Sequence, residues 1–239
     1  MEFIIVFILL VIILISGYFL FDIRIKKMKE AGHNIKLDDT TSKFPENREI
    51  CEEVLKMLNN KNVKIKEESM QNNKKKTSTS LYVALTDTIF IGNIKDTYTR
   101  IQTICHECLH SIQPRRMLLF NFIYSNVYII YFIISVILSL MGVIKDIKLQ
   151  IIIISIMSFM YYVIRSYLET DAMIKAKYLA KEYMNDYIKV NPVCSKKNVE
   201  EVVQEYDKVN KLGIPAYNYV LFVKCFIKIG IIVLVGMFK

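Results

Sequence analysis

The sequence has few histidines, an odd number of cysteines and no internal repeat. Five cysteines, in a chain whose polar parts are expected to face a reducing compartment, predict no structural disulfide. The chain starts with Met-Glu, so the basic stretch of a secretory signal is missing, and its first apolar run leads straight into DIRIKKMK without a small-residue cleavage site. We therefore interpret this run as an uncleaved membrane anchor.

Long apolar runs account for most of the 53% hydrophobic content. The first has nineteen residues without a charge, close to the roughly 20 that a helix needs to cross a bilayer. The fourth holds Lys224 and Lys228 near its middle, and a lysine at the bilayer centre costs about 2.5 to 3.5 kcal/mol. It therefore either spans with a partner or water at these lysines, or lies in the interface. The four runs cover residues 3 to 21, 117 to 144, 149 to 164 and 216 to 238.

Lysine and arginine near the span ends predict the orientation. The short loop between the second and third runs offers only Lys145 and Lys148, whereas the ends that adjoin the two large polar segments carry three to five basic residues each. We expect a multi-pass protein of the cell membrane with both polar segments in the cytoplasm. A basic face beside an anionic leaflet then accounts for the net charge of +9, and no nucleic-acid partner is needed.

The fold class that these patterns predict is α+β, a mostly helical membrane protein with three to four transmembrane helices and one small domain. Its polar part should hold a strand in NVKIKEE and a hairpin or pair of edge strands in LYVAL and TIFIG. Helices are expected at 45 to 59, at 97 to 113 with Asp96 as N-cap and Pro114 as stop, through the third run to Asn191, and from Ser195 to Gly213. The expected parts are an anchor (1–21), an α/β part (22–116), a transmembrane hairpin (117–168), a helical part (169–213) and a C-terminal apolar helix (214–239).

The stretch CHECLH carries the chemistry. His106 and His110 are four residues apart on a predicted helix, so both imidazoles project from one face toward a single ion. Glu107 lies beside them, where it can deprotonate a water bound to zinc. Such a short pattern also occurs by chance, but two of the chain's three histidines belong to it. The third, His33, is expected to be a solvated bystander.

Cys105 and Cys108 raise the rival interpretation of a thiolate zinc or redox site. On a helical wheel the cysteines point away from the histidines, so we expect them to be small buried apolar residues.

A catalytic zinc needs three protein ligands and an open position. Glu169 is the best third ligand, because two neighbouring antiparallel spans joined by a short loop return the chain to the surface that it left. Asp171 is about 200° further around the helix, so it can orient a histidine, pair with a lysine or replace Glu169 as the ligand. Glu182 is a weaker candidate and is expected to be solvated.

These residues resemble the YugP-like membrane neutral zinc metallopeptidases, whose hallmark is H-E-x-G-H-A-x-Q followed, after a hydrophobic hairpin, by E-x-D-A. The chain has HECLHSIQ from His106 to Gln113 and ETDA from Glu169 to Ala172, and the resemblance extends over most of its length. It departs from the pattern with Leu109 in place of glycine and Ser111 in place of alanine. The resemblance implies a zincin-like domain, with His106, His110 and Glu169 as zinc ligands and Glu107 as base.

The leading hypothesis is a membrane-bound zinc endopeptidase, a hydrolase that cleaves peptides or proteins near the inner leaflet, with the LYVAL or TIFIG edge aligning the substrate. The alternative is a non-catalytic membrane protein, such as a sensor or assembly protein. It would have a metal site, or only a helix that resembles one. A transporter is a third hypothesis, prompted by Lys224 and Lys228, but the large polar segments and the scarcity of intramembrane acids argue against it.

Overall fold

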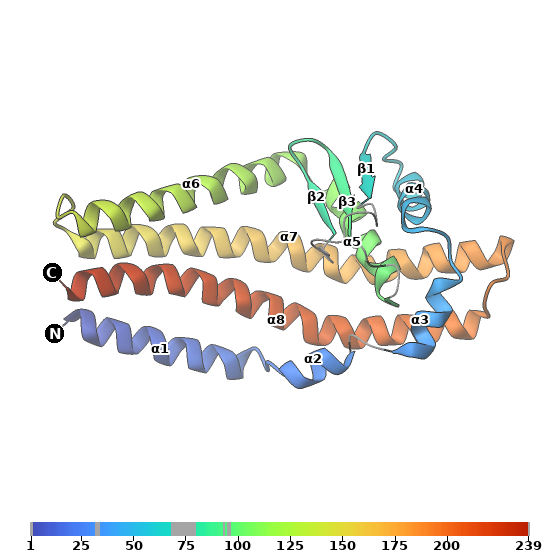
Figure 1. The fold of residues 1–239 in the computed structure, drawn as a ribbon, viewed down its shortest axis with the longest axis horizontal. Coiled ribbons are helices and arrows are strands. Elements are labelled where there is room, and N and C mark those ends of the chain that lie inside the picture. Colours follow the sequence, from blue (N-terminus) through green and yellow to red (C-terminus); the bar gives the residue numbers. More distant parts are fainter. Residues whose placement is uncertain (1, 32–33, 68–79, 93, 95–96, 239) are drawn as a thin grey trace, which may run out of the picture. The chain divides into compact units, whose positions relative to one another are not determined.

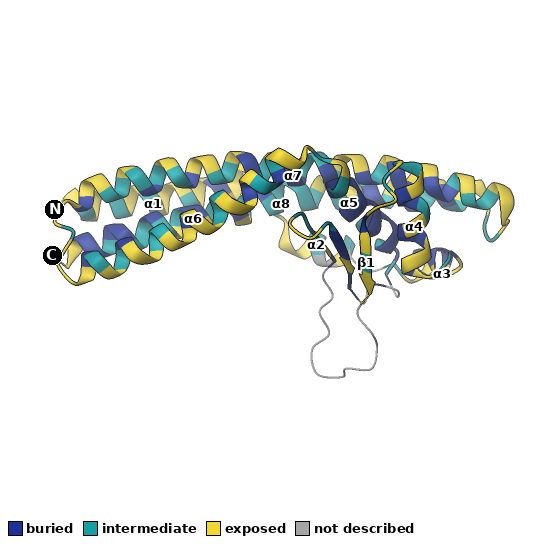
Figure 2. Ribbon diagram, turned by 90° about the horizontal axis from the view of Figure 1, so that it is seen from above, coloured by how far each residue is buried: buried dark blue, intermediate teal, exposed yellow. Residues whose placement is uncertain are grey.

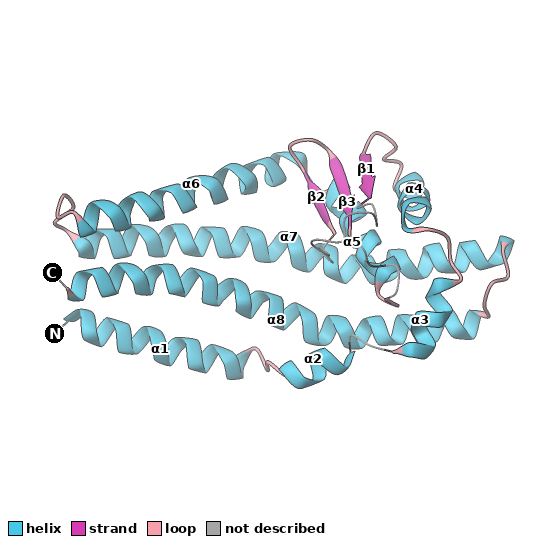
Figure 3. Cartoon of the chain, in the orientation of Figure 1, coloured by secondary structure: helices cyan, strands magenta, loops and turns pink. Residues whose placement is uncertain are grey.

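A computed structural model describes residues 2–31, 34–67, 80–92, 94 and 97–238 (Figure 1). The chain is mostly helical and has one small sheet, as predicted (Figure 3). The helices are α1 (Glu2–Leu20), α2 (Ile25–Ala31), α3 (Ile35–Ser42), α4 (Asn47–Met57), α5 (Arg100–Ile112), α6 (Arg115–Leu140), α7 (Ile147–Val190) and α8 (Lys196–Met237). The strands are β1 (Lys64–Glu67), β2 (Leu81–Val83) and β3 (Thr88–Ile91).

The chain divides into two compact units, and the long helices α7 and α8 each contribute to both. The first, the apolar unit, comprises Met1–Ile23, Phe120–Tyr167 and Ile214–Lys239. The second, the sheet unit, comprises Arg24–Leu119 and Leu168–Gly213. The motif stretch and both candidate acids belong to the sheet unit.

The apolar unit supplies the membrane character of the chain. Four helices, α1, α6, α7 and α8, are each long and apolar enough to cross a membrane, which is consistent with a membrane protein. Many of their large apolar side chains are exposed, most evidently along α1 and α6 (Figure 2). The ammonium of Lys228 lies 4.8 Å from the ring centre of Tyr128, and it also donates to the carbonyl oxygen of Lys224 at 3.5 Å. One of the two lysines in the fourth apolar run therefore has partners within the unit.

The sheet has the order β1-β3-β2, with β1 parallel and β2 antiparallel to β3. The pair β2 and β3 forms the expected hairpin, and its register places Tyr82 opposite Ile89. Since β3 is the central strand, the TIFIG run offers no open edge to a substrate. The LYVAL run remains as the candidate edge, through strand β2.

The core of the sheet unit packs α4 against α5. Ile50, Cys51 and Val54 of α4 are fully buried with Ile101 and Cys105 of α5. This arrangement follows from the spacing of three and four residues between apolar positions, which gives each helix one continuous buried face.

A buried arginine fixes the segment between α3 and α4. Arg100, the first residue of α5, has no exposed surface, and its guanidinium donates to the carbonyl oxygens of Thr41, Phe44 and Pro45 and to Oδ1 of Asn47 at 2.7 to 2.9 Å. Thr41 lies in the last turn of α3, and Phe44 and Pro45 follow that helix, in a region where backbone acceptors often lack helical partners. The guanidinium therefore ties the end of α3 to the segment that leads into α4.

Several predicted helix ends need correction. Helix α5 begins at Arg100 with Thr99 as N-cap, and the expected cap Asp96 lies outside the described residues. The helix expected to end at Gly213 does not end there, because α8 continues through Gly213 and Pro215 to Met237. An internal proline removes one hydrogen bond and costs about 3 kcal/mol, which long helical segments on both sides can absorb. The predicted end of the long helix near Asn191 is confirmed, since α7 ends at Val190.

Candidate metal centre

Helix α5 presents the two motif histidines side by side. Their ring centres are 4.6 Å apart with the planes at 85°, and the two Nε2 atoms are 3.1 Å apart. His110 is buried and His106 is partly buried. The spacing of four residues, slightly more than one helical turn, produces this convergence.

Helix α7 brings the third candidate ligand to the same point. Oε2 of Glu169 lies 3.3 Å from Nε2 of His106 and 3.6 Å from Nε2 of His110. Glu169 is buried, with 7% of its surface exposed. The predicted cluster of His106, His110 and Glu169 therefore exists, and it could hold a metal ion.

The separations fit a small tetrahedral ion. Donor atoms at 2.0 to 2.2 Å from such an ion are about 3.3 to 3.6 Å from one another. The three observed separations, 3.1, 3.3 and 3.6 Å, fall in or close to this range. Two imidazole nitrogens and a carboxylate oxygen that converge in a buried place need a cation or protons between them, because their lone pairs otherwise repel.

Gln113, just after α5, controls which nitrogen of His110 carries the proton. Its Nε2 donates to the carbonyl oxygen of Leu168 at 2.8 Å, so its Oε1 is the atom that faces Nδ1 of His110, also at 2.8 Å. Nδ1 must then carry the hydrogen, and Nε2 presents a lone pair to the cluster. Sequence reasoning placed Gln113 only within the family motif and gave it no role, because its partner Leu168 is 55 residues away.

Asp171 lies one step from the cluster. Its carboxylate pairs with Lys175 at 2.7 Å and accepts from Nε2 of Gln113 at 3.4 Å. Of the alternatives left open for Asp171, pairing with a lysine is thus observed, and its link to a histidine runs through Gln113. Glu182, the weaker candidate, is exposed as expected.

Glu107 is almost completely buried beside the histidines, with 6% of its surface exposed. Burial raises the pKa of its carboxyl above the ordinary value, although the two histidines and the N–H of Tyr82, which donates to the carboxylate, act in the opposite direction. Tyr82 belongs to β2, so the edge strand contacts the site. A carboxyl whose pKa is raised above its ordinary value accepts a proton more readily than an ordinary carboxylate does.

The electrostatics of His110 depend on Glu169. Burial by itself lowers the pKa of His110, but the hydrogen bond and charge of Glu169, with further contributions from Gln113 and Glu107, outweigh it and raise this pKa. A buried negative field of this kind also attracts a divalent cation.

The cysteines take no part in the cluster. Cys105 and Cys108 are fully buried, and burial raises the pKa of both thiols. Sγ of Cys108 lies 3.6 Å from Sγ of Cys51 on α4, with no disulfide between them, and all five cysteines are free. This agrees with the prediction that they are buried apolar residues and that no structural disulfide forms. His33 lies outside the described residues.

Known proteins offer no direct guide to this arrangement. Comparison with protein-family models, with curated proteins and with solved structures finds no match to this chain. The cluster itself carries the information on function: two imidazoles, one buried carboxylate as a third donor, and a second buried carboxyl beside them.

Proposed function

We propose that this chain is a membrane-bound zinc-dependent endopeptidase. The observation that carries the proposal is the convergence of His106, His110 and Glu169 within 3.1 to 3.6 Å of one another, with the buried carboxyl of Glu107 beside them. Two histidines and one glutamate form one of the known ligand sets of catalytic zinc, which leaves a fourth position open.

The donor set favours zinc over harder cations. Imidazole nitrogen suits zinc and other transition metals, whereas magnesium and calcium prefer oxygen alone. A zinc ion held by these three residues would supply Lewis-acid chemistry, by polarising a carbonyl and making water more acidic.

Glu107 is the proposed general base. It accepts the proton of the attacking water and then delivers it to the leaving amine, which balances the hydrolysis of a peptide bond. Its burial excludes competing solvent, and the N–H of Tyr82 holds the carboxylate in place. Gln113 maintains the tautomer of His110 through both steps.

Strand β2 is the proposed guide for the substrate. It is an edge of the sheet, since β3 is its single partner among the described strands. An extended peptide can add to such an edge through main-chain hydrogen bonds, and the contact of Tyr82 with Glu107 would bring that peptide to the base.

The four apolar helices favour substrates that are membrane proteins or membrane-proximal peptides. Glu169 follows the apolar run 149 to 164 by only five residues, and the distribution of basic residues favours a site on the cytoplasmic side. The partners proposed are a peptide or protein substrate near the inner leaflet and the lipid bilayer. The resemblance of the HECLHSIQ and ETDA stretches to YugP-like peptidases supports the same activity.

The test uses the full chain purified in detergent. Metal analysis should find about one zinc per chain in the wild type and in Glu107→Gln, and much less in His106→Ala, because two remaining ligands bind zinc weakly. A peptide library should be cleaved by the wild type, and Glu107→Gln should be slower by roughly 10² to 10⁴-fold.

The pattern of results separates this proposal from its rival. Zinc in the wild type with no cleavage, and no difference from Glu107→Gln, would favour a metal-binding sensor or assembly protein. Equal zinc content in the wild type and in His106→Ala would exclude both metal-dependent functions at this site.

A further inference from the structure

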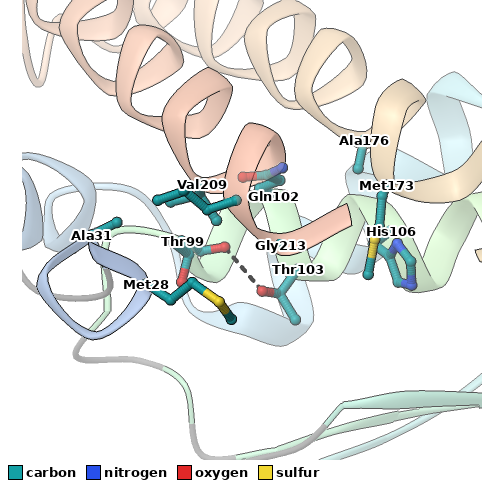
Figure 4. Close-up of a pocket in the computed structure, with 11 residues that line it drawn as sticks. Met28, Ala31, Thr99, Gln102, Thr103, His106, Met173, Ala176, Val209 and Gly213 are labelled. Atoms are coloured by element: carbon teal, nitrogen blue, oxygen red, sulfur yellow. Dashed lines mark hydrogen bonds between the residues drawn. The ribbon is translucent and has the colours of Figure 1, made fainter. Parts of the chain in front are cut away.

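A cavity of about 370 Å³ lies in the sheet unit with His106 in its wall (Figure 4). This volume is within the range of ligand pockets in proteins. Helices α2, α5, α7 and α8 all contribute to its lining, which includes Met28, Thr103, Met173, Ala176, Val209 and Gly213.

The cavity adjoins the metal cluster through His106, which belongs to both. On α5, His110 and His106 of the cluster are followed toward the helix start by Thr103 and Thr99, at steps of four, three and four residues. On α7, Glu169 is followed by Met173 and Ala176, at steps of four and three. Such steps keep side chains on one helical face, so both helices turn toward the cavity the same faces that carry the ligands.

Helix geometry gives the length of α5 that borders the cavity. The seven residues from His106 to Thr99 correspond to about 10 Å along α5. This length accommodates one long side chain of a substrate whose main chain passes the metal cluster.

The lining selects for an apolar group. No aspartate, glutamate, lysine or arginine of the described residues lines the cavity. Two of the polar residues that do have hydrogen-bond donors already in use: Oγ1 of Thr103 donates to the carbonyl of Thr99 at 3.1 Å, and Nε2 of Gln102 donates to Asn210 at 2.7 Å, while the buried Oε1 of Gln102 has no partner among the described residues and is a neutral acceptor. A charged side chain would be desolvated there without a partner of opposite charge, which is costly.

We propose that this cavity is the specificity pocket of the enzyme, which receives a large apolar side chain, such as leucine, methionine or phenylalanine, next to the cleaved bond. The inference rests on the proposed peptidase function and adds the substrate class. A membrane lipid is the other apolar candidate. Its acyl chain is considerably longer than the 10 Å of helix that borders the cavity, and its headgroup would meet no charged residue among those that line it.

Gly213 allows the pocket to be filled without disturbing its walls. A Cβ added at Gly213 meets nothing within 4 Å, so Gly213→Leu places a side chain in open space at the cavity lining. Leucine also favours a helix more than glycine does, which protects α8 from unfolding. Gly230→Leu is the matched control, because Gly230 lies on the same helix, has no atom within 4 Å of an added Cβ and does not line the cavity.

The experiment compares two zinc-binding peptide hydroxamates that differ only in carrying a leucine or a glycine side chain. In the wild type and in Gly230→Leu, the leucine compound should bind roughly ten- to a hundredfold more tightly, as expected for burial of that side chain. In Gly213→Leu, this ratio should fall close to one, with zinc content unchanged.

Two results would overturn the inference. One is an affinity ratio of the leucine to the glycine compound that Gly213→Leu leaves unchanged. The other is a co-purifying lipid that is present in the wild type and absent from Gly213→Leu.

Failure of the pocket assignment and failure of the peptidase function give different results. Cleavage of library peptides without any preference for apolar residues keeps the peptidase function and removes the pocket assignment, whereas absence of zinc and of cleavage removes the function itself.

Discussion

The two units of the chain each have a buried apolar core, but they differ in the polar side chains that they bury. Every charged or imidazole side chain that is buried among the described residues, Arg100, Glu107, His110 and Glu169, belongs to the sheet unit. The buried polar residues of the apolar unit are serines and asparagines, with Ser158 bonded to Tyr128 at 2.6 Å as an example. In the apolar unit, large apolar side chains occupy the outer surface instead.

This contrast shows how the surroundings decide what a fold can contain. In water, apolar side chains are driven inside, and a charge left among them needs several partners. Helices in lipid have no such drive, so small polar contacts between them hold the unit together while apolar groups face outward. The cluster that could hold a metal ion accordingly belongs to the sheet unit, where buried charges have partners.

The largest effect on stability is expected where a buried charge supports many partners. Arg100→Met removes the guanidinium from the acceptors of Thr41, Phe44, Pro45 and Asn47. The Thr41 oxygen keeps the N–H of Phe44 at 3.2 Å, and each buried acceptor that is left without a donor costs about 1 to 3 kcal/mol. We expect destabilisation of the sheet unit by about 3 kcal/mol or more, with faster hydrogen exchange in residues 41 to 47. Arg48→Met is the control, because Arg48 is exposed and its partner among the described residues is Glu52, one turn away. Unchanged exchange in Arg100→Met would contradict the assigned role of the arginine.

A smaller effect is expected for the residue that orients His110. Gln113→Leu removes the acceptor from Nδ1 and frees the ring, and loss of such a partner lowers metal affinity by roughly 10 to 100-fold. Competition with a zinc chelator measures the affinity. Gln150→Leu is the matched variant in the apolar unit, where Gln150 accepts from Tyr131 at 2.8 Å, and it should leave zinc affinity unchanged. Equal losses in both variants would mean that Gln113 acts only through general stability.

The smallest effect is expected for the charge in the apolar unit. Lys228→Met removes the contact with the ring of Tyr128, but it also removes the cost of a lysine in an apolar helix, so the two contributions oppose each other. Zinc affinity and cleavage rate should stay within about twofold of the wild type, because the site belongs to the other unit. A more than tenfold loss of cleavage rate in Lys228→Met would contradict the independence of the site from the apolar unit.

Local patterns in the sequence were sufficient for the helical spans, the hairpin and the common face of His106 and His110. Each of these depends on residues a few positions apart, where helical or strand periodicity relates sequence directly to geometry. The sequence favoured Glu169 over Asp171 as the residue that meets the histidines, and the structure has Glu169 there. Tertiary structure alone decided that β2 and not β3 is an edge, that Gln113 holds His110, and that α8 continues beyond Gly213. These features depend on how segments distant in the chain pack together, and such packing leaves no periodic trace in the sequence.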